Sequence, residues 1–282
     1  MKDLKIGVIV ESFRQGLEGG IKKAAEVGAQ GVQIYASRGE MAPEGLSTAR
    51  KKEILDLIKS EGLVVSALCS EMGGFTADLA DNREKIDRTK RIMDLALEME
   101  TNVITAHIGV VPKDNTIDAY KILQDACREL AEYGEDIGAT FAIETGPETA
   151  DTLKTFIDSV DSKGLGVNFD PANLVMVVGD DPVKGVYTLK DYIVHTHAKD
   201  GIQLRPSYPE HVYGTVPEHY VEDDGKPNFI EVPLGEGKVD FDGWINALVE
   251  IGFKGFLTIE REVGDSPEED IKIGRASCRE RV

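Results

Sequence analysis

Eight short runs rich in β-branched residues alternate with longer amphipathic segments along this chain of 282 residues, and that alternation limits the fold more than any other feature. Strands covered by helices on both faces are expected to be apolar along their whole length, as these runs largely are. Repeated strand–helix units predict parallel strands joined by helices. The predicted strands are residues 5–10, 31–35, 64–68, 103–108, 140–144, 166–170, 192–197 and 255–260.

The segments between these runs place apolar residues at helical spacing. The clearest predicted helices are residues 47–61, 81–98, 116–137 and 240–251. Ser47 is a typical N-cap residue for the first of them. Just before a strand, four helical patterns are followed by a glycine that can end a helix in the left-handed conformation: Gly28, Gly62, Gly138 and Gly252.

Eight such repeats with no linker between them predict one α/β domain, a single (β/α)₈ TIM barrel over residues 1–272. The alternative is an open, doubly wound sheet, which usually carries a glycine-rich phosphate loop after its first strand. Here the first run is followed by ESFR (residues 11–14), so that fingerprint is absent. The sequence therefore favours the closed barrel.

The chain is strongly acidic, with a formal net charge of −19. This argues against a nucleic-acid partner, whose phosphates call for a basic surface. The apolar run near the N-terminus is too short for a signal peptide, and no apolar stretch approaches the roughly 18 residues of a membrane span. The three cysteines are widely spaced and form neither a disulfide framework nor a zinc motif. We expect a cytoplasmic protein with a small polar substrate and no membrane partner; a homodimer or homotetramer is compatible with the sequence.

Residues 201–237 do not follow the alternation, because they are rich in proline and aromatic residues and too long for an ordinary connection. The segment follows the seventh predicted strand, on the side where barrel enzymes build their active sites. We interpret it as a long loop at the mouth of the barrel that either covers the substrate or contacts another subunit.

The last ten residues, IGRASCRERV (273–282), carry three arginines in a chain that is otherwise acidic. They resemble the conceptual translation of a sequencing-library adaptor. We therefore expect native sequence to stop near Lys272, inside the last barrel helix, and we exclude residues 273–282 from reasoning about the site.

Ionisable residues stand at the ends of the later predicted strands. In a barrel these ends meet at one mouth, so side chains from different strands come together there. Buried carboxylates and imidazoles need compensation, and a divalent cation supplies it. The predicted ligands of one metal ion are Glu144, Asp170, His197 and Glu260, and a further imidazole comes from His107.

Two glutamates, one aspartate and one histidine form a mixed oxygen and nitrogen ligand set. This set favours Mn²⁺, while Mg²⁺, Co²⁺ or Zn²⁺ would also fit, and it contains no thiolate that would indicate a structural zinc site.

Other polar residues near the predicted mouth receive weaker interpretations. His195 lies two residues before His197 on the same strand face, so it is expected to pack inside the barrel or to support the site. Glu71 could contact substrate, and Glu262 could share the face of Glu260 or lie in the loop beyond. Two histidines of the long segment are expected to be solvated: His211 and His219.

These residues and three motifs resemble the xylose-isomerase-like sugar-phosphate isomerase/epimerase superfamily, over essentially the whole chain up to Lys272. The motifs are DPAN (170–173), HTHAKD (195–200) and GEGKVDF (235–241). In that superfamily the strand-end Glu, Asp, His and Glu bind one divalent metal, and ketose 3-epimerases also use the two glutamates as the acid/base pair. By this likeness the metal ligands are Glu144, Asp170, His197 and Glu260.

The chain departs from the superfamily pattern at Asn173, where many members have histidine, so a substrate contact is expected to differ. Abasic-site endonucleases share the barrel but use three metals and many more histidine ligands. Asn173 and the acidic charge of the chain disfavour that reading.

The resulting prediction is a divalent-metal-dependent isomerase or epimerase of a sugar or related hydroxy-carbonyl compound, acting through a metal-stabilised enediolate. Glu144 and Glu260 form the predicted proton-transfer pair. The predicted substrate contacts are His107, Asn173, Lys199 and Glu71.

Three alternatives remain open from the residues. A lyase could use the same site and lose a β-hydroxyl after proton abstraction, as inosose dehydratases of this superfamily do. A two-carboxylate glycosidase would leave Asp170 and His197 unexplained. A degenerate barrel could bind a sugar or a partner protein without catalysis.

Overall fold

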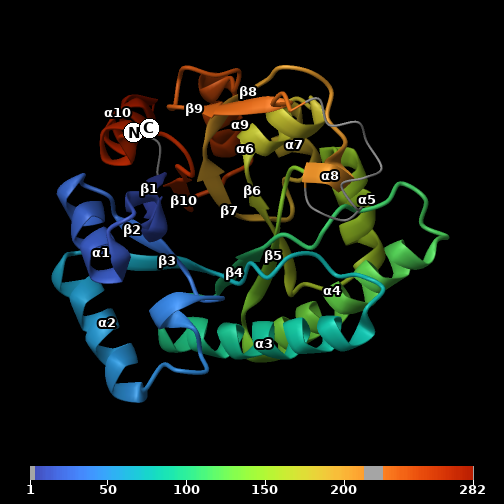
Figure 1. The fold of residues 1–282 in the computed structure, drawn as a ribbon, viewed down its shortest axis with the longest axis horizontal. Coiled ribbons are helices and arrows are strands. Elements are labelled where there is room, and N and C mark those ends of the chain that lie inside the picture. Colours follow the sequence, from blue (N-terminus) through green and yellow to red (C-terminus); the bar gives the residue numbers. More distant parts are fainter. Residues whose placement is uncertain (1–3, 213–224, 282) are drawn as a thin grey trace.

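The computed structural model describes residues 4–212 and 225–281, apart from the side chain of His211. Eight parallel strands close into a barrel in the order β1-β10-β7-β6-β5-β4-β3-β2, with the helices outside them (Figure 1). This confirms the predicted (β/α)₈ barrel and all eight predicted strands. The strands are β1 (Lys5–Ile9), β2 (Gly31–Tyr35), β3 (Val64–Cys69), β4 (Val103–Ala106), β5 (Thr140–Glu144), β6 (Leu165–Phe169), β7 (Ile193–Ala198) and β10 (Phe256–Ile259).

The four clearest predicted helices are present, with each end within two residues of the expected position. Ser47 caps α2 as predicted, since its side chain accepts a hydrogen bond from the Arg50 backbone N–H at 3.2 Å. All four glycines predicted to end helices have positive φ. The longer helices are α1 (Gly16–Glu26), α2 (Thr48–Ser60), α3 (Leu79–Glu98), α4 (Asp118–Ile137), α5 (Ala150–Val160), α9 (Phe241–Glu250) and α10 (Pro267–Arg281).

The connection after β6 is divided into three short helical segments. It consists of α6 (Pro171–Asn173), a π-helical turn (Leu174–Val178) and the short helix α7 (Pro182–Thr188). Asp170 caps α6, because its Oδ1 accepts hydrogen bonds from the backbone N–H groups of Ala172 and Asn173 at 2.7 and 3.0 Å. The DPAN motif therefore bends the chain sharply at the barrel mouth.

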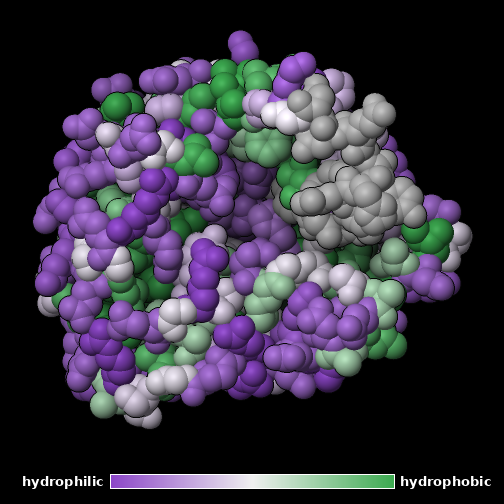
Figure 2. All heavy atoms as spheres, in the orientation of Figure 1, coloured by the Kyte–Doolittle hydropathy of each residue, from purple (hydrophilic) through white to green (hydrophobic). Residues whose placement is uncertain are grey.

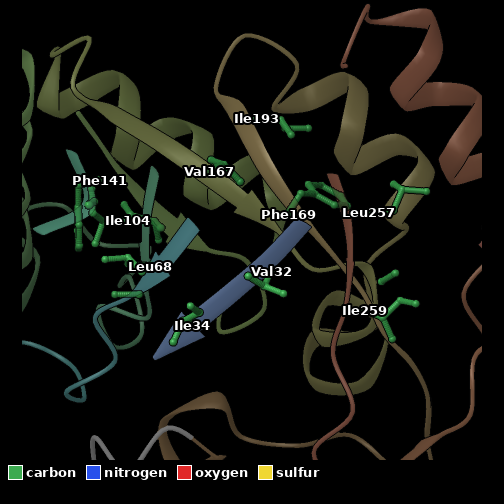
Figure 3. Close-up of a cluster of buried hydrophobic side chains, with 14 of the residues drawn as sticks. Val32, Ile34, Leu68, Ile104, Phe141, Val167, Phe169, Ile193, Leu257 and Ile259 are labelled. Atoms are coloured by element: carbon green, nitrogen blue, oxygen red, sulfur yellow. The ribbon is translucent and has the colours of Figure 1, made fainter. Parts of the chain in front are cut away.

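Alternate residues of each strand divide the barrel wall into two faces. One set is apolar and packs in the hydrophobic core, as the labelled side chains of Figure 3 show; it includes Val32, Ile34, Ile104, Phe141, Val167, Phe169, Leu257 and Ile259. The intervening residues face the barrel interior, and several are polar: Gln33, Thr105, Asn168, His195 and Thr258. The interior of this barrel is therefore partly a hydrogen-bonded polar layer.

The long segment after β7 has more structure than the loop predicted for residues 201–237. It contains an antiparallel pair, β8 (Asp200–Gln203) with β9 (Phe229–Val232), and the short helix α8 (Pro209–Val212). The pair lies beside the barrel mouth (Figure 1). The sequence prediction missed these strands because each has only four residues, without clear alternation.

Asp200 connects two of the sequence motifs. Its Oδ2 accepts hydrogen bonds from the backbone N–H groups of Gly235 and Gly237, both at 2.9 Å, and its Oδ1 accepts one from Val239 at 3.1 Å. A Cβ atom at Gly237 would lie 2.0 Å from Asp200 Oδ1, so only glycine fits this approach. The HTHAKD and GEGKVDF motifs thus fold against each other and close the segment.

Within the described residues, the structure contains no helix with the length and apolar character that a membrane crossing requires. Helix α10 continues past Lys272 to Arg281, with Cys278 buried. The foreign origin of residues 273–282 stays a prediction.

Candidate metal centre

Four residues from neighbouring strands converge at the mouth of the barrel. Glu144 is the last residue of β5, Asp170 and Glu260 directly follow β6 and β10, and His197 lies near the end of β7. One ligand atom from each lies within 4.8 Å of the others. All four side chains are buried, with exposed fractions of 6%, 0%, 5% and 1% in that order. We call this group the carboxylate–histidine cluster.

His197 lies at the centre of the cluster. Its Nδ1 is 3.3 Å from Glu144 Oε1, 3.3 Å from Glu260 Oε2 and 3.7 Å from Asp170 Oδ2. Burial alone would lower the pKa of His197, but the carboxylates of Glu144 and Glu260 raise it well above its usual value. The cluster therefore favours positive charge at its centre.

Two buried atoms of the cluster make no hydrogen bond with any described residue: Nδ1 of His197 and Oδ2 of Asp170. Leaving such atoms unsatisfied costs roughly 1–3 kcal/mol each, and more when they are charged. Both point into the space between the carboxylates, where a cation would coordinate them.

Gln33 of β2 orients the histidine, and the sequence analysis missed it. Its amide nitrogen donates to Thr105 Oγ1 at 3.1 Å, which leaves its oxygen to accept from His197 Nε2 at 3.0 Å. A proton on Nε2 leaves a lone pair on Nδ1, directed at the carboxylates. Such an outer partner is what holds a metal-binding histidine in the correct tautomer.

Asn168 joins the cluster to the polar layer below it and was also missed. Its amide nitrogen lies 3.1 Å from both Glu144 Oε2 and His197 Nε2, and its oxygen lies 2.9 Å from His195 Nδ1. His195 Nε2 in turn lies 3.0 Å from Thr258 Oγ1. His195 is therefore packed inside the barrel beneath His197.

Asn173 and Lys199 contact the two glutamates of the cluster. Asn173 Nδ2 donates to Glu144 Oε1 at 3.2 Å, and Lys199 Nζ donates to Glu260 Oε2 at 3.0 Å. Burial would raise the pKa of Glu260, but Lys199 and His197 hold it well below its usual range. Both residues were predicted to contact substrate. In the structure each donates a hydrogen bond to a predicted metal ligand.

Glu71 and His107 form a pair on the other side of the mouth. Glu71 Oε2 lies 3.0 Å from His107 Nδ1 and accepts a hydrogen bond from the His107 backbone N–H at 2.9 Å. His107 Nε2 lies 3.7 Å from Glu144 Oε1. Although burial opposes it, the charges of Glu144 and Glu71 raise the pKa of His107 to about 9.

The segment after β10 and strand β9 add further charged groups. Glu262 forms an ion pair with Lys199, so it shares the mouth with Glu260. Glu231 of β9, which the sequence analysis did not single out, lies 2.6 Å from Arg261 Nη1 and 3.8 Å from Lys199 Nζ. The β8–β9 pair therefore contributes directly to the site. Two predicted solvated groups lie outside the described residues: the side chain of His211 and the residue His219.

A cavity of about 530 Å³ lies over the cluster. This volume is in the range of small-molecule sites. In Figure 2 the face shown is hollowed near its middle, with hydrophilic atoms inside the hollow and hydrophobic residues above it. The cavity brings together most of the residues predicted to bind metal or substrate: Glu71, His107, Glu144, Asn173, His197, Lys199 and Glu260.

The donor set fits a divalent cation. Three buried carboxylates supply hard oxygen ligands, and His197 Nδ1 supplies one nitrogen ligand once a cation takes the place of its proton, as Mn²⁺, Mg²⁺ and related ions require. A cation between them would satisfy the two unpartnered atoms and balance the buried negative charge.

The chain matches one protein-family model and several curated proteins. The model, described as xylose isomerase-like TIM barrel, matches residues 21–281. An uncharacterized protein of Methanocaldococcus jannaschii is 24% identical over 213 residues, which are 71% of this chain and 64% of that protein. An inosose dehydratase of Lacticaseibacillus casei is 24% identical over 151 residues, which are 52% of this chain and 48% of that enzyme. The matches thus span about half to two thirds of the length of these curated relatives.

Solved structures share the fold over nearly the whole chain. A xylose isomerase domain protein from Planctomyces limnophilus superposes with a TM-score of 0.75 at 25% identity, covering 98% of this chain and 94% of that one. A D-tagatose 3-epimerase-like protein superposes with a TM-score of 0.72 at 20% identity, covering 99% and 98%.

Proposed function

Because this chain belongs to the xylose isomerase-like TIM-barrel family, we propose that it is a divalent-metal-dependent isomerase or epimerase of a sugar or a related hydroxy-carbonyl compound. The observation that carries the proposal is the buried carboxylate–histidine cluster on the floor of a cavity of small-molecule size. Epimerase-like structures with the same fold support it.

The four residues of the cluster would hold one divalent ion, with Mn²⁺ favoured. When bound, the ion supplies Lewis-acid polarisation of a substrate carbonyl. Glu144 and Glu260 form the proton-transfer pair, because one oxygen of each lies within 4.8 Å of the other and both residues line the cavity. One carboxylate removes the proton from the carbon next to the carbonyl, and the other returns a proton.

The site of proton return determines the product. Return to the opposite face of the same carbon gives an epimer, and return to the neighbouring carbon exchanges an aldose for a ketose. Asn173 and Lys199 position the two carboxylates, and the Glu71–His107 pair faces the cavity and orients substrate hydroxyls.

A lyase reaction is the second candidate, favoured by the likeness to an inosose dehydratase. It needs the same proton abstraction, followed by loss of a β-hydroxyl as water. The two reactions differ in whether the substrate loses water, so one experiment separates them.

The test is solvent deuterium exchange by protein stripped of metal and reloaded with Mn²⁺, screened over D-fructose, an inosose and hydroxypyruvate. We expect metal-dependent deuterium incorporation next to the carbonyl without net dehydration. Removing one member of the proton-transfer pair should slow exchange by at least ~10²-fold, since general acid–base catalysis contributes that much or more. The variants are Glu144→Gln and Glu260→Gln.

Glu148→Gln is the matched control, because Glu148 is buried in the loop that directly follows Glu144 but does not line the cavity over the cluster. Full turnover and metal retention in Glu144→Gln would contradict the scheme. Net loss of water would select the lyase. Failure of the reloaded protein to hold any metal would favour a non-catalytic binding barrel.

We also propose a cytoplasmic location and a substrate that is a small sugar or polyol rather than nucleic acid. Sedimentation of the purified protein gives its mass in solution and so tests whether it forms a homodimer or a homotetramer, with either of which the sequence is compatible.

A further inference from the structure

We infer that the site takes an uncharged ketose or cyclic polyol ketone and rejects substrates that carry a phosphate or carboxylate group. This inference rests on the proposed function and names its substrate class. It comes from the distribution of charge around the cavity.

The cavity wall is dominated by carboxylates. Five glutamates line it: Glu71, Glu144, Glu231, Glu260 and Glu262. Among the described residues that line the cavity, Lys199 is the only lysine or arginine, and the charged imidazole of His107 is paired with Glu71 at 3.0 Å and lies 3.7 Å from Glu144. Even with a divalent ion on the cluster, an anionic substituent would face more negative than positive groups, and like charges in such proximity cost several kcal/mol.

Lys199 is already neutralised by carboxylates. It is 4% exposed, and its Nζ lies 3.0 Å from Glu260 Oε2, 3.8 Å from Glu231 Oε2 and in an ion pair with Glu262. A phosphate group would have to compete with these three carboxylates for Lys199, and displacing Glu260 would leave a buried carboxylate without its cationic partner, which is costly. Lys199 is therefore arranged to hold Glu260, and an anion gains little from it.

The arginines near the mouth are also engaged. Arg261 is bound by Glu231 and by Asp270, whose Oδ2 lies 2.8 Å from its Nε. Arg14 donates to the backbone carbonyls of Gly264 and Glu262. Arg38 lies over the ring of Tyr35, 4.2 Å from its centroid. Residues 213–224, which lie outside the described part of the chain, contain neither lysine nor arginine.

The position of the acidic residues is informative as well. TIM barrels that bind phosphorylated substrates frequently hold the phosphate with the loops after the seventh and eighth strands. In this barrel those strands are β7 and β10, and the segments that follow them carry Glu231 and Glu262. Carboxylates thus occupy the region where a phosphate would be received.

The remaining wall suits the carbon skeleton of a neutral sugar. It includes Tyr35, Met176, Val177, Phe229 and Ile230, which offer apolar surface beside the polar floor. A ring or chain with C–H groups on one side and hydroxyls on the other matches such a cavity.

The test uses substrate pairs that differ only in phosphate: D-fructose with D-fructose 6-phosphate, and D-xylulose with D-xylulose 5-phosphate. Deuterium exchange by the Mn²⁺-loaded protein gives kcat/KM for each, and calorimetry gives binding. We expect the neutral sugar of each pair to be preferred by at least ~100-fold, in keeping with a like-charge cost of several kcal/mol. Equal or better use of the phosphorylated sugar would overturn the inference.

The variant Glu262→Gln tests whether the carboxylates at the mouth cause the preference for the neutral sugar. Glu262→Gln removes one partner of Lys199 at the mouth, and we expect it to narrow the preference for the neutral sugar by ~10-fold or more. Glu84→Gln makes the same charge change on the exposed side of α3 and should leave the preference unchanged. A preference that Glu262→Gln leaves intact would overturn the assignment to these carboxylates.

The two proposals fail differently. Exchange confined to phosphorylated sugars would overturn only the substrate class. Absence of exchange with every sugar would overturn the proposed function, and the calorimetric comparison would then still decide whether the cavity prefers the neutral partner of each pair.

Discussion

The two halves of the barrel mouth are built differently. Strands β5, β6, β7 and β10 are neighbours in the barrel, and each brings one member of the carboxylate–histidine cluster; we call them the ligand half. Strands β1 to β4 form the facing half, where Gln33 touches His197 and the Glu71–His107 pair lines the cavity, but no residue belongs to the cluster. The ligand half gathers buried carboxylates around His197, whereas the facing half reaches this group through Gln33 and His107.

This difference predicts two classes of variant. A change in the ligand half should remove the cation and the chemistry together. A change in the facing half should weaken or redirect binding while the ligands stay in place. The following predictions run from the largest expected effect to the smallest.

Asp170→Asn should have the largest effect on metal affinity. It removes a charged ligand, yet an asparagine side chain can still cap α6 through its oxygen. We expect Mn²⁺ affinity, measured by calorimetry, to fall by more than the ~10–100-fold typical of losing an outer partner. Without metal, the melting temperature of the variant should be no lower than that of the metal-free wild type, because the variant carries one fewer buried charge. Unchanged Mn²⁺ affinity would contradict the claim that the ligand half binds the cation.

Gln33→Leu tests the facing half. It removes the acceptor that fixes the His197 tautomer but touches no carboxylate of the cluster. We expect Mn²⁺ affinity to fall by ~10–100-fold, as for other outer partners of metal-binding histidines.

Its matched control is Gln30→Leu, just before the same strand, where the side chain accepts a hydrogen bond from the Ile6 N–H. That change should cost about 1 kcal/mol of stability and leave metal affinity unaltered. Equal effects of the two changes on Mn²⁺ binding would refute a specific role for Gln33.

Removal of the metal should lower stability. The native protein binds the ion at a site the unfolded chain lacks, so an excess of 100 times the Kd should add about 2.7 kcal/mol to the free energy of unfolding. Thermal melts with EDTA and with added Mn²⁺ measure this difference. Identical melting curves would mean that the cluster holds no ion.

Glu148 lies where the two halves meet, since it follows β5 and accepts a hydrogen bond from the backbone N–H of Val111, after β4, at 3.2 Å. Burial raises its pKa from 4.5 to about 8, against the lowering effect of that N–H group. Between pH 4.5 and 8 the folded state therefore holds a proton that the unfolded state has lost. Its contribution to stability falls as pH rises through this window, by at most about 1.4 kcal/mol per pH unit.

Glu148→Gln keeps the acceptor and removes the titration. Urea unfolding at pH 5, 6, 7 and 8 should show the variant gaining stability relative to the wild type as pH rises. A constant difference across that range would contradict the raised pKa.

Much of the fold was predictable because it depends on local patterns. The apolar runs and the glycines after helices mark the strand–helix units, and alternation places Asp170 and His197 on the interior face of their strands. Since the carboxyl ends of parallel strands converge, the four members of the carboxylate–histidine cluster followed from strand ends alone.

The supporting residues were not predictable, because their roles depend on distant partners. Gln33 is one polar residue in an apolar strand, and its contact with His197 spans 164 positions. Glu231 lies on a short strand that the sequence does not signal, and its ion pairs with Arg261 and Lys199 come from tertiary packing. The carboxylate partners of Lys199 were not predictable for the same reason, and its predicted contact with substrate stays a prediction.

The most direct test of the central claim is a crystal structure of the Mn²⁺-loaded protein with anomalous data collected at the manganese edge. The account predicts a single anomalous peak within coordination distance of one oxygen each of Glu144, Asp170 and Glu260 and of His197 Nδ1. A peak at another location, such as between Glu71 and His107, or a fully loaded crystal with no peak at the cluster, would contradict it.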